Sequence, residues 1–423
     1  MPASTRPDHW QAHAVGSAVV LSAILGTAAY TGLWVLTAIP VGFLFGFFLQ
    51  KGDLCGASAF SEVLLMKDGR KVFGLWVCIV VSMGAFALLQ ALGWGRLNPK
   101  PLFLLNHVVG GVVFGIGIVL AGGCVMGSLF KTGAGNLNSM AALIGIPLGV
   151  GMVEYGPLQS FHAALKQFEI KADDGGPLTL ASATGLPFGV IAIGLAMVTL
   201  AVALVIRRRR GTPTLATSAT RAWFAGSPTR PWKPWQAGVA IGLLAGPALL
   251  SSAASGRNYP LGVTHGVLHA YLLVTDRNLT HCWHPEPPAG TGKAQPEGAT
   301  NADTDQATAA KPNGRGPASR GKKIVWWLVA MVGSLVVGSW TAARWTGRAR
   351  LLPKPPGQTV VAFFGGILVG VGAAIGMGCV TGNILSGWAL MSVGSIVFGL
   401  ATMLANWVTT YFYLMGGTLT TRG

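Results

Sequence analysis

Three cysteines in this sequence lie in similar glycine-rich contexts. Cys55 lies in DLCGAS (53–58), Cys124 in GGCVMGS (122–128) and Cys379 in GMGCVTGN (376–383). A buried thiol resists ionisation because desolvation penalises the thiolate, and a neutral S–H is a weak, polarisable donor. Such contacts suit a large, soft sulfur anion, which they would hold without trapping. The three thiols are therefore candidates for a stepwise anion pathway.

Two of these contexts belong to an internal repeat without a gap. Residues 110–129 and 365–384 match at six pairs of glycines, at the cysteines and at the following valines. A third copy of the skeleton Gly-x3-Gly-x8-Cys-x2-small starts at Gly42 and reaches Cys55, and a fourth, degenerate copy starts at Gly238 with Ser251 in place of cysteine. The order of the copies predicts two homologous halves, 1–160 and 186–423.

The glycines beside the cysteines predict corners at which one helix ends and a short helix begins. Glycine adopts backbone conformations that are closed to other residues, and we expect this of Gly123 and Gly378. Cys124 and Cys379 would then lie near the N-terminus of a short helix, where free N–H groups and the helix dipole favour an anion. The predicted corner glycines are Gly56, Gly123, Gly127, Gly378 and Gly382. The Gly-x3-Gly spacing by itself indicates close helix packing.

Other polar residues of the repeat either line the pathway or cap helices. The candidates for lining are Ser58, Ser251, Thr381 and Asn383. Cys78 lies in a smooth apolar run and is expected to fill space in the core. Cys282 lies in His-Cys-Trp-His, which supplies too few ordered ligands for a metal ion. We expect no metal site, no cofactor and no catalytic residue.

The elements that would position these residues are membrane helices. Of the 423 residues, 51% are hydrophobic and only 10% are charged, against roughly 25% in an ordinary soluble domain. A soluble protein could not cover its surface with so little charge, so the composition predicts an all-α polytopic membrane protein. The apolar segments 39–50, 236–250 and 259–274 are shorter than the roughly 20 residues that span a bilayer. They predict broken or re-entrant helices, which are tolerated where they line a pathway.

The charge of the chain indicates membrane topology. The formal net charge is +17, and most basic residues lie between apolar stretches, as in a multi-pass protein of a bacterial inner membrane. No basic and aromatic module predicts binding to nucleic acid. The second half contains a polar stretch, 276–323, that is rich in Pro, Gly, Thr and Ala and has the composition of a disordered insertion. A shorter polar linker spans 211–234.

The three cysteine motifs resemble those of the YeeE/YedE family of sulfur-related membrane proteins, and the resemblance extends over both halves. It implies an hourglass-like helical fold in which short helices meet in the middle of the membrane. It also implies uptake of thiosulfate along Cys55, Cys124 and Cys379, and a TusA-like sulfur-carrier protein as a partner at the cytoplasmic face. The polar insertion is not part of the family pattern.

These observations lead to one main hypothesis and two alternatives. The main hypothesis is an inner-membrane permease, not an enzyme, that passes thiosulfate or a related sulfur anion through the lipid bilayer along the cysteine thiols. The first alternative is a membrane sulfurtransferase in which a cysteine becomes a persulfide, which requires an activated thiolate. The second alternative is a membrane scaffold that transports nothing.

Overall fold

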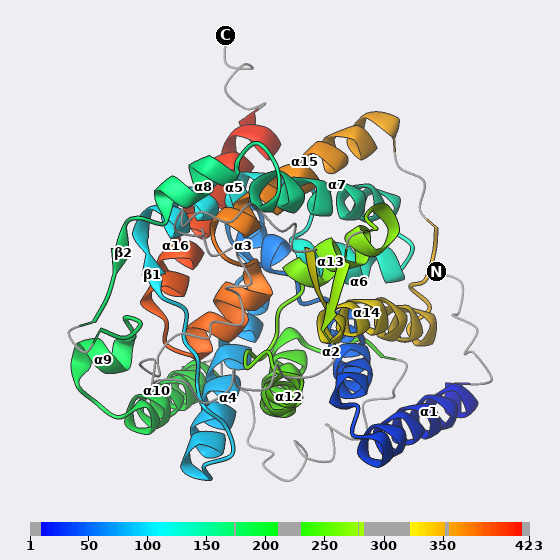
Figure 1. The fold of residues 1–423 in the computed structure, drawn as a ribbon, viewed down its shortest axis with the longest axis vertical. Helices are drawn as coiled ribbons and strands as arrows, with labels where there is room; N and C mark the ends of the chain where they lie inside the picture. The colour runs from blue at the N-terminus through cyan, green and yellow to red at the C-terminus, as the bar shows by residue number, and fades with distance from the viewer. Residues whose placement is uncertain are drawn as a thin grey trace, which may run out of the picture.

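The computed structural model describes residues 10–172, 175–209, 230–277, 279–282, 322–351 and 355–416. Within these ranges nine apolar helical segments are long enough to cross a membrane. The strands in this described part of the chain form two short pairs. The expected all-α polytopic membrane fold is therefore confirmed, and Figure 1 shows the arrangement of its helices.

Eight α-helices lie within residues 10–170. They are α1 (Trp10–Thr31), α2 (Ala38–Gly52), α3 (Gly56–Leu65), α4 (Arg70–Ala91), α5 (Leu104–Leu120), α6 (Val125–Gly133), α7 (Leu137–Glu154) and α8 (Gln159–Leu165). A 3₁₀ turn, η1 (Trp34–Thr37), separates α1 from α2. The short strands β1 (Leu102–Phe103) and β2 (Glu169–Ile170) pair antiparallel on one side of the molecule.

The rest of the chain contains a second series of helices. They are α9 (Leu180–Thr184), α10 (Phe188–Arg209), α12 (Pro234–Ala254), α13 (Thr264–Thr275), α14 (Trp326–Trp345), α15 (Pro356–Ile375) and α16 (Val393–Thr409), with the π-helical segments η2 (Val380–Gly387) and η3 (Thr410–Leu414). Strands β3 (Leu279–Cys282) and β4 (Lys322–Val325) pair in parallel. They bring together the two ends of the predicted insertion, whose residues 283–321 lie outside the described residues, as do residues 210–229 of the linker region.

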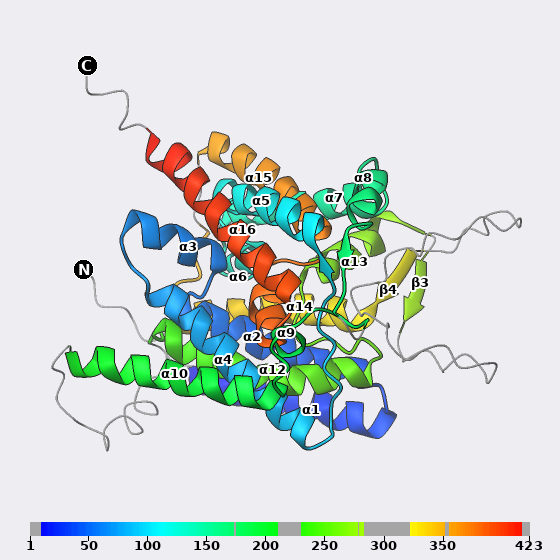
Figure 2. The same ribbon diagram turned by 90° about the vertical axis from the view of Figure 1, so that its left-hand side faces the viewer.

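Corresponding helices of the repeat pack against each other in opposite directions. In the pair α2 and α12, Gly52 contacts Ala237 at one end and Thr37, just before α2, contacts Ser251 at the other. The α5 and α15 pair is also antiparallel, because Gly110 contacts Gly376 whereas Gly365 contacts Ala121. Figure 2 shows α4, α12, α2 and α10 below and α15, α5 and α16 above. The short helix α3 lies at the left of that view and α13 at the right.

The repeat glycines let helices approach to backbone contact. A Cβ at Gly46 of α2 would overlap the carbonyl oxygen of Leu335 in α14, and a Cβ at Gly238 of α12 would overlap that of Gly74 in α4. In the upper layer, Gly370 of α15 meets Ile146 of α7 in the same way. Small residues provide such contacts between membrane helices, where burial of apolar surface gives little driving force.

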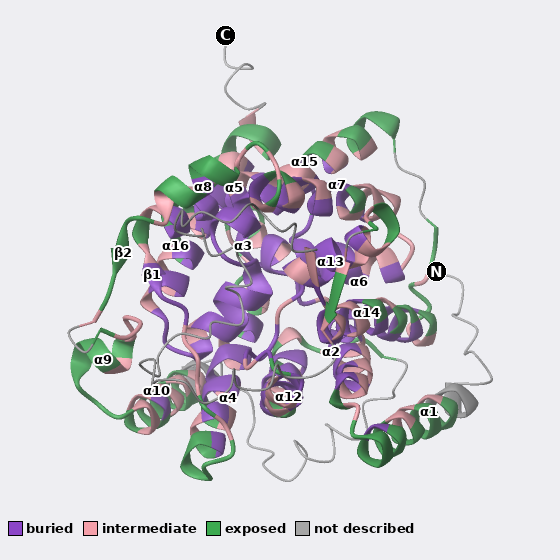
Figure 3. Ribbon diagram, viewed as in Figure 1, coloured by how far each residue is buried: buried purple, intermediate pink, exposed green. Residues whose placement is uncertain are grey.

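The periphery of the bundle is apolar and exposed. Helix α10 exposes large hydrophobic side chains along its length, including Val190, Ile193 and Met197, and it is largely green in Figure 3. The buried residues gather in the centre, around α3 and the start of η2. An exposed apolar periphery with a buried, partly polar centre fits a helix bundle surrounded by lipid.

Two of the apolar segments that were expected to be short differ from each other in the structure. Segment 236–250 is not a short piece, because α12 runs from Pro234 to Ala254 and is long enough to span a membrane. Pro247 lies inside this helix without ending it. By contrast, α13 has only 12 residues, so the segment 259–274 does contain a short helix.

Candidate substrate pathway

Each of the three repeat cysteines is the N-cap of a short helical segment. Cys55 precedes α3, Cys124 precedes α6 and Cys379 precedes η2. All three have extended backbones and are fully buried. The expectation that Cys124 and Cys379 start short helices is therefore confirmed, and Cys55 does the same.

The sharp turn before each cysteine lies two residues upstream. Asp53, Gly122 and Met377 all have left-handed backbones, with φ of 47°, 67° and 56°. Gly378 also has a positive φ, of 145°, as expected. Gly123 does not, so the expectation for that glycine was wrong. The left-handed residue ends the preceding helix, and the cysteine two residues later is extended.

The three corners meet in the centre of the molecule. The Cys55 and Cys124 sulfurs both lie beside Gly127, and Cys379 is close enough to Cys124 to interact with it electrostatically. A Cβ at Gly127 would overlap the Cys55 sulfur and lie 3.6 Å from the Cys124 sulfur. A Cβ at Gly56 would lie 2.8 Å from Val380, the residue after Cys379. Gly56 and Gly127 therefore provide the space in which the thiols come together.

A hydroxyl side chain follows each cysteine within four residues. The Ser58 hydroxyl donates to the Cys55 carbonyl over 3.3 Å. Ser128 and Thr381 are fully buried, and their hydroxyls have no hydrogen-bond partner within the described residues. Buried polar atoms are normally satisfied by protein, water or a ligand. The three corners therefore have hydrogen-bonding capacity beyond the thiols.

The Cys379 corner is held by a network of side chains. The Asn383 amide donates to the carbonyls of Gly376 and Gly378, at 2.8 and 2.9 Å. The Tyr259 hydroxyl donates to the Gly382 carbonyl at 2.6 Å. Lys100, only 3% exposed, donates to the Met377 carbonyl and to Asn383. Asn383 thus fixes the turn, and Lys100 contacts the backbone and the amide on either side of Cys379.

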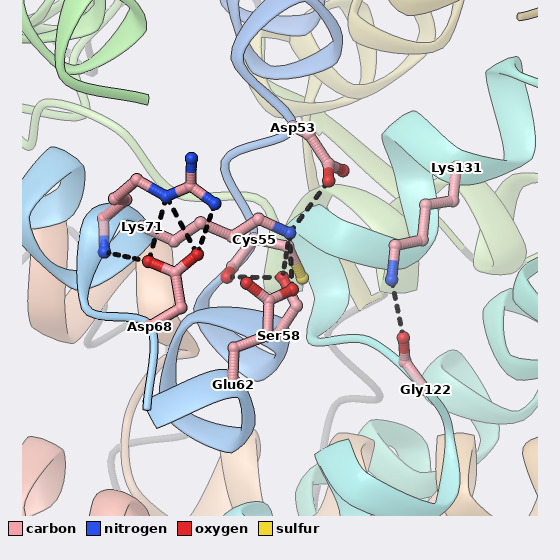
Figure 4. Close-up of polar contacts among 9 residues, drawn as sticks. Asp53, Cys55, Ser58, Glu62, Asp68, Lys71, Gly122 and Lys131 are labelled. Atoms are coloured by element: carbon pink, nitrogen blue, oxygen red, sulfur yellow. Dashed lines mark hydrogen bonds and ion pairs between the residues drawn. The ribbon is translucent and has the colours of Figure 1, made fainter. Parts of the chain in front are cut away.

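An ion-pair cluster lies beside the Cys55 corner. The Lys71 amine contacts Asp53 at 2.8 Å, Glu62 at 2.7 Å and the Ser58 hydroxyl at 3.3 Å. Figure 4 shows this amine between the two carboxylates, close to Cys55. Lys71 is only 16% exposed, so the cluster links a buried corner to the surface.

A pocket of about 220 Å³ continues from this cluster. Its lining includes Lys51, Asp53, Glu62, Lys71 and Arg348, so positive and negative groups face each other across it. Asp68 also lines it, and hydrogen bonds from Arg70 lower the pKa of that carboxyl to about 2. On the far side of the corner, Lys131 of α6 donates to the Gly122 carbonyl at 2.7 Å.

Ser251 does not lie at a corner, so the register of the fourth repeat copy was wrong. It is inside α12, where it accepts a hydrogen bond from Trp327 at 2.8 Å and interacts with Thr37. The helix continues past Ser251 because the first left-handed residue is Gly256, with φ of 85°. The N-cap of the next short helix, α13, is Val263. The structure brings Ser58, Thr381 and Asn383 to cysteine corners, but not Ser251.

The two remaining cysteines lie elsewhere. Cys78 is buried within α4, in contact with α12 near Gly242. Cys282 is partly exposed in β3, and Trp283 and His284 of its motif lie outside the described residues. Neither is brought to the three corners.

Lys100, Ser128 and Tyr259 were missed by the sequence analysis. Lys100 stands between Pro99 and Pro101, in a connection that also contains Arg96 and Asn98, so no local pattern distinguishes it as a buried charge. Tyr259 lies in residues 255–263, which connect α12 to the short helix α13 and are longer than the connections at the three cysteines.

The comparison with known protein families agrees with this geometry. Residues 51–408 match a family described as sulphur transport, and this range contains all three cysteine corners. The chain belongs to this sulphur-transport family. The resemblance to the YeeE/YedE family is thereby confirmed.

Individual members of the sulphur-transport family are similar over almost the whole chain. A thiosulfate transporter, TsuA, from Spirochaeta thermophila is 29% identical over 388 residues, covering 89% of this chain and 98% of the relative. TsuA from Escherichia coli is 26% identical, covering 88% of this chain and 94% of the relative. A probable transporter, YedE, from Escherichia coli matches at 27% identity over 36% of this chain and 39% of its own length. These relatives are named as transporters.

Proposed function

We propose that this protein is a membrane transporter that passes thiosulfate across the bilayer. The observation that carries the proposal is the meeting of three buried, N-capping cysteines at the centre of a membrane helix bundle. The similarity to the two TsuA proteins over nearly their full length supports thiosulfate as the substrate.

The proposed pathway uses neutral thiols as transient donors. Thiosulfate enters at the Cys379 corner, moves to the Cys124 and Cys55 pair and leaves through the pocket beside Lys71. S–H contacts are weak, and the first-turn N–H groups of the short helices add partial positive charge. The anion is therefore stabilised at each step without a deep minimum, which conduction requires. No covalent change is needed, so the protein is not an enzyme in this proposal.

Two inverted repeats would build this pathway. The antiparallel packing of α2 on α12 and of α5 on α15 supports a division into homologous halves, 1–160 and 186–423, related by an axis in the membrane plane. The Cys55 and Cys124 corners then reach the centre from one side and the Cys379 corner from the other.

The basic pocket indicates the orientation in the membrane. Lys51, Arg70, Lys71 and Arg348 gather around it. By the positive-inside rule this side faces the cytoplasm, and we place the protein in a bacterial inner membrane with the Cys379 corner facing outward. A TusA-like sulfur carrier would be a partner on this cytoplasmic face, beside the pocket at Lys71.

Purified protein in liposomes tests the proposal. Radiolabelled thiosulfate should accumulate inside the vesicles in a saturable way, and unlabelled thiosulfate should compete. Empty liposomes are the control. Absence of protein-dependent uptake would reject transport and leave the scaffold alternative.

The same sample separates transport from sulfurtransferase chemistry. Intact-mass measurement after exposure to thiosulfate should show the unmodified chain. A mass increase of one sulfur atom that disappears on reduction would indicate a cysteine persulfide and favour the enzymatic alternative.

A further inference from the structure

We propose that the Cys379 corner contains a charge-selective oxyanion site, in which the Lys100 ammonium, the Thr381 hydroxyl and the first-turn N–H groups of η2 bind the oxygens of a divalent sulfur oxyanion. This site deepens the proposed function and rests on it. The thiols bind the soft sulfur end of the anion. This site binds the charged oxygen end and favours a dianion over a monoanion.

The position of the Lys100 ammonium is the first argument. It comes from the connection between α4 and α5, far from Cys379 in sequence, yet it is buried against that corner. A Cβ at Gly378 would lie 2.8 Å from its nitrogen, and a Cβ at Gly382 would lie 3.5 Å from it. The ammonium therefore lies close to the backbone just before η2 and to the backbone of its first turn. Placing a cation at such depth is costly, and this cost is typical of functional sites in membrane proteins.

The Thr381 hydroxyl is the second argument. Thr381 belongs to the first turn of η2 and is fully buried. Its hydroxyl has no hydrogen-bond partner in the part of the chain that the structure describes. An unsatisfied buried hydroxyl destabilises a fold unless a ligand or water completes it. An anion at this corner would supply the missing acceptor.

The N-terminus of η2 provides the third argument, because its N-cap cysteine differs from that of α6. Cys124 accepts a hydrogen bond from Gly127 at 3.4 Å and so caps its own helix. Among the described residues, Cys379 makes no such side-chain cap to η2. The first-turn N–H groups of this eight-residue segment are therefore not taken by the cysteine, and such groups bind anions.

Tyr259 and Arg257 complete the surroundings of the site. The centre of the Tyr259 ring lies 5.0 Å from the Lys100 nitrogen and 5.5 Å from the Arg257 guanidinium. Arg257 is 5% exposed and donates to the Tyr259 carbonyl at 3.0 Å. Two buried positive charges near one corner raise the local potential, which favours a dianion over a monoanion of similar size.

Exchange of the Lys100 charge tests the site. In liposomes, Lys100→Gln should raise the KM for thiosulfate about tenfold, the loss expected for one charge-assisted hydrogen bond. It should also lower the preference for thiosulfate over thiocyanate, a sulfur-containing monoanion, whereas Lys100→Arg should keep that preference. Lys171→Gln, at an exposed lysine, is the matched control. Wild-type KM and wild-type preference in Lys100→Gln would overturn the proposal.

Thr381→Val gives a test that does not depend on the folding of a lysine variant. The substitution keeps the shape and removes a hydroxyl that bonds to nothing in the described structure, so the melting temperature should stay equal or rise. The KM for thiosulfate should nevertheless rise about threefold. An unchanged KM with a raised melting temperature would show that the hydroxyl binds no substrate and would overturn its assignment.

Direct binding separates this site from the proposed function. Calorimetry with thiosulfate should show binding to the purified wild-type protein and at least tenfold weaker binding to Lys100→Gln. If the wild type binds in this way but liposomes show no uptake, transport fails and the site stands. If the wild type transports and Lys100→Gln binds equally well, the site fails and transport stands.

Discussion

At the scale of single residues, Lys71 neutralises two carboxylates that lie beside the Cys55 corner. Its amine contacts both Asp53 and Glu62, and the same amine reaches Ser58 of the corner. An anion leaving Cys55 would otherwise face two negative charges in a partly buried pocket. Coulomb repulsion in such surroundings is several times stronger than in bulk water.

We therefore predict that Lys71→Gln lowers thiosulfate uptake about tenfold, because the carboxylates then repel the anion. The double variant Lys71→Gln with Glu62→Gln should recover part of the rate, since it removes one of the two negative charges. Initial uptake rates in liposomes measure both. Lys67→Gln, at an exposed lysine in the loop just before α4, is the control. A double variant as slow as the single one would contradict the electrostatic explanation.

At the scale of elements, the repeat glycines let helices of the two halves pack at backbone distance. In the α15 and α7 pair, a Cβ at Gly370 would overlap the Ile146 carbonyl oxygen and lie 2.9 Å from the Val150 nitrogen. Both obstacles are backbone atoms, which cannot rotate away. The helices would have to separate to accept any side chain.

We predict that Gly370→Ala lowers the melting temperature in detergent by about 2–5 °C, because overpacking costs about 1–3 kcal/mol. Gly333→Ala, in α14, is the control, since a Cβ there meets nothing within 4 Å. Gly333→Ala should leave the melting temperature unchanged or raise it, because alanine has a higher helix propensity than glycine. Equal losses in both variants would show that close packing at Gly370 is unimportant.

The sequence predicted the helix corners better than the details within them. The cysteine motifs repeat, so the N-cap positions of Cys124 and Cys379 could be expected from glycine spacing. The left-handed residue was misplaced by one position, at Gly123 instead of Gly122, because adjacent glycines cannot be told apart by type. Ser251 was misplaced because α12 extends through it and the turn comes only at Gly256.

Long-range contacts explain what sequence reasoning missed. Lys100 and Cys379 are far apart in the chain, and only the packing of the connection between α4 and α5 brings them together. The same holds for Tyr259, whose hydroxyl reaches Gly382. No local pattern encodes such pairs.

At the scale of the whole molecule, α2 is antiparallel to α12 and α5 is antiparallel to α15. Different loops and strands therefore lie on the two sides of the membrane. The loop containing Lys67 lies on the side of the basic pocket. Strand β2, with Lys171 directly after it, lies beside β1 at the opposite end of α4.

This arrangement predicts which residues can be labelled from outside the cell. In a chain carrying Cys282→Ser, to remove the partly exposed native thiol, Lys171→Cys should react with a membrane-impermeant maleimide in intact cells. Lys67→Cys should react only after the membrane is opened. Labelling of both residues in intact cells, or of Lys67→Cys alone, would contradict the orientation.

The most direct test of the cysteine pathway is thiosulfate uptake by liposomes containing single cysteine variants. Cys55→Ala, Cys124→Ala and Cys379→Ala should each reduce the initial rate at least tenfold, because each removes a donor from one narrow route. Cys78→Ala removes a buried thiol outside the three corners and should transport like the wild type. Near-normal uptake in the three corner variants, with all proteins folded, would contradict the account.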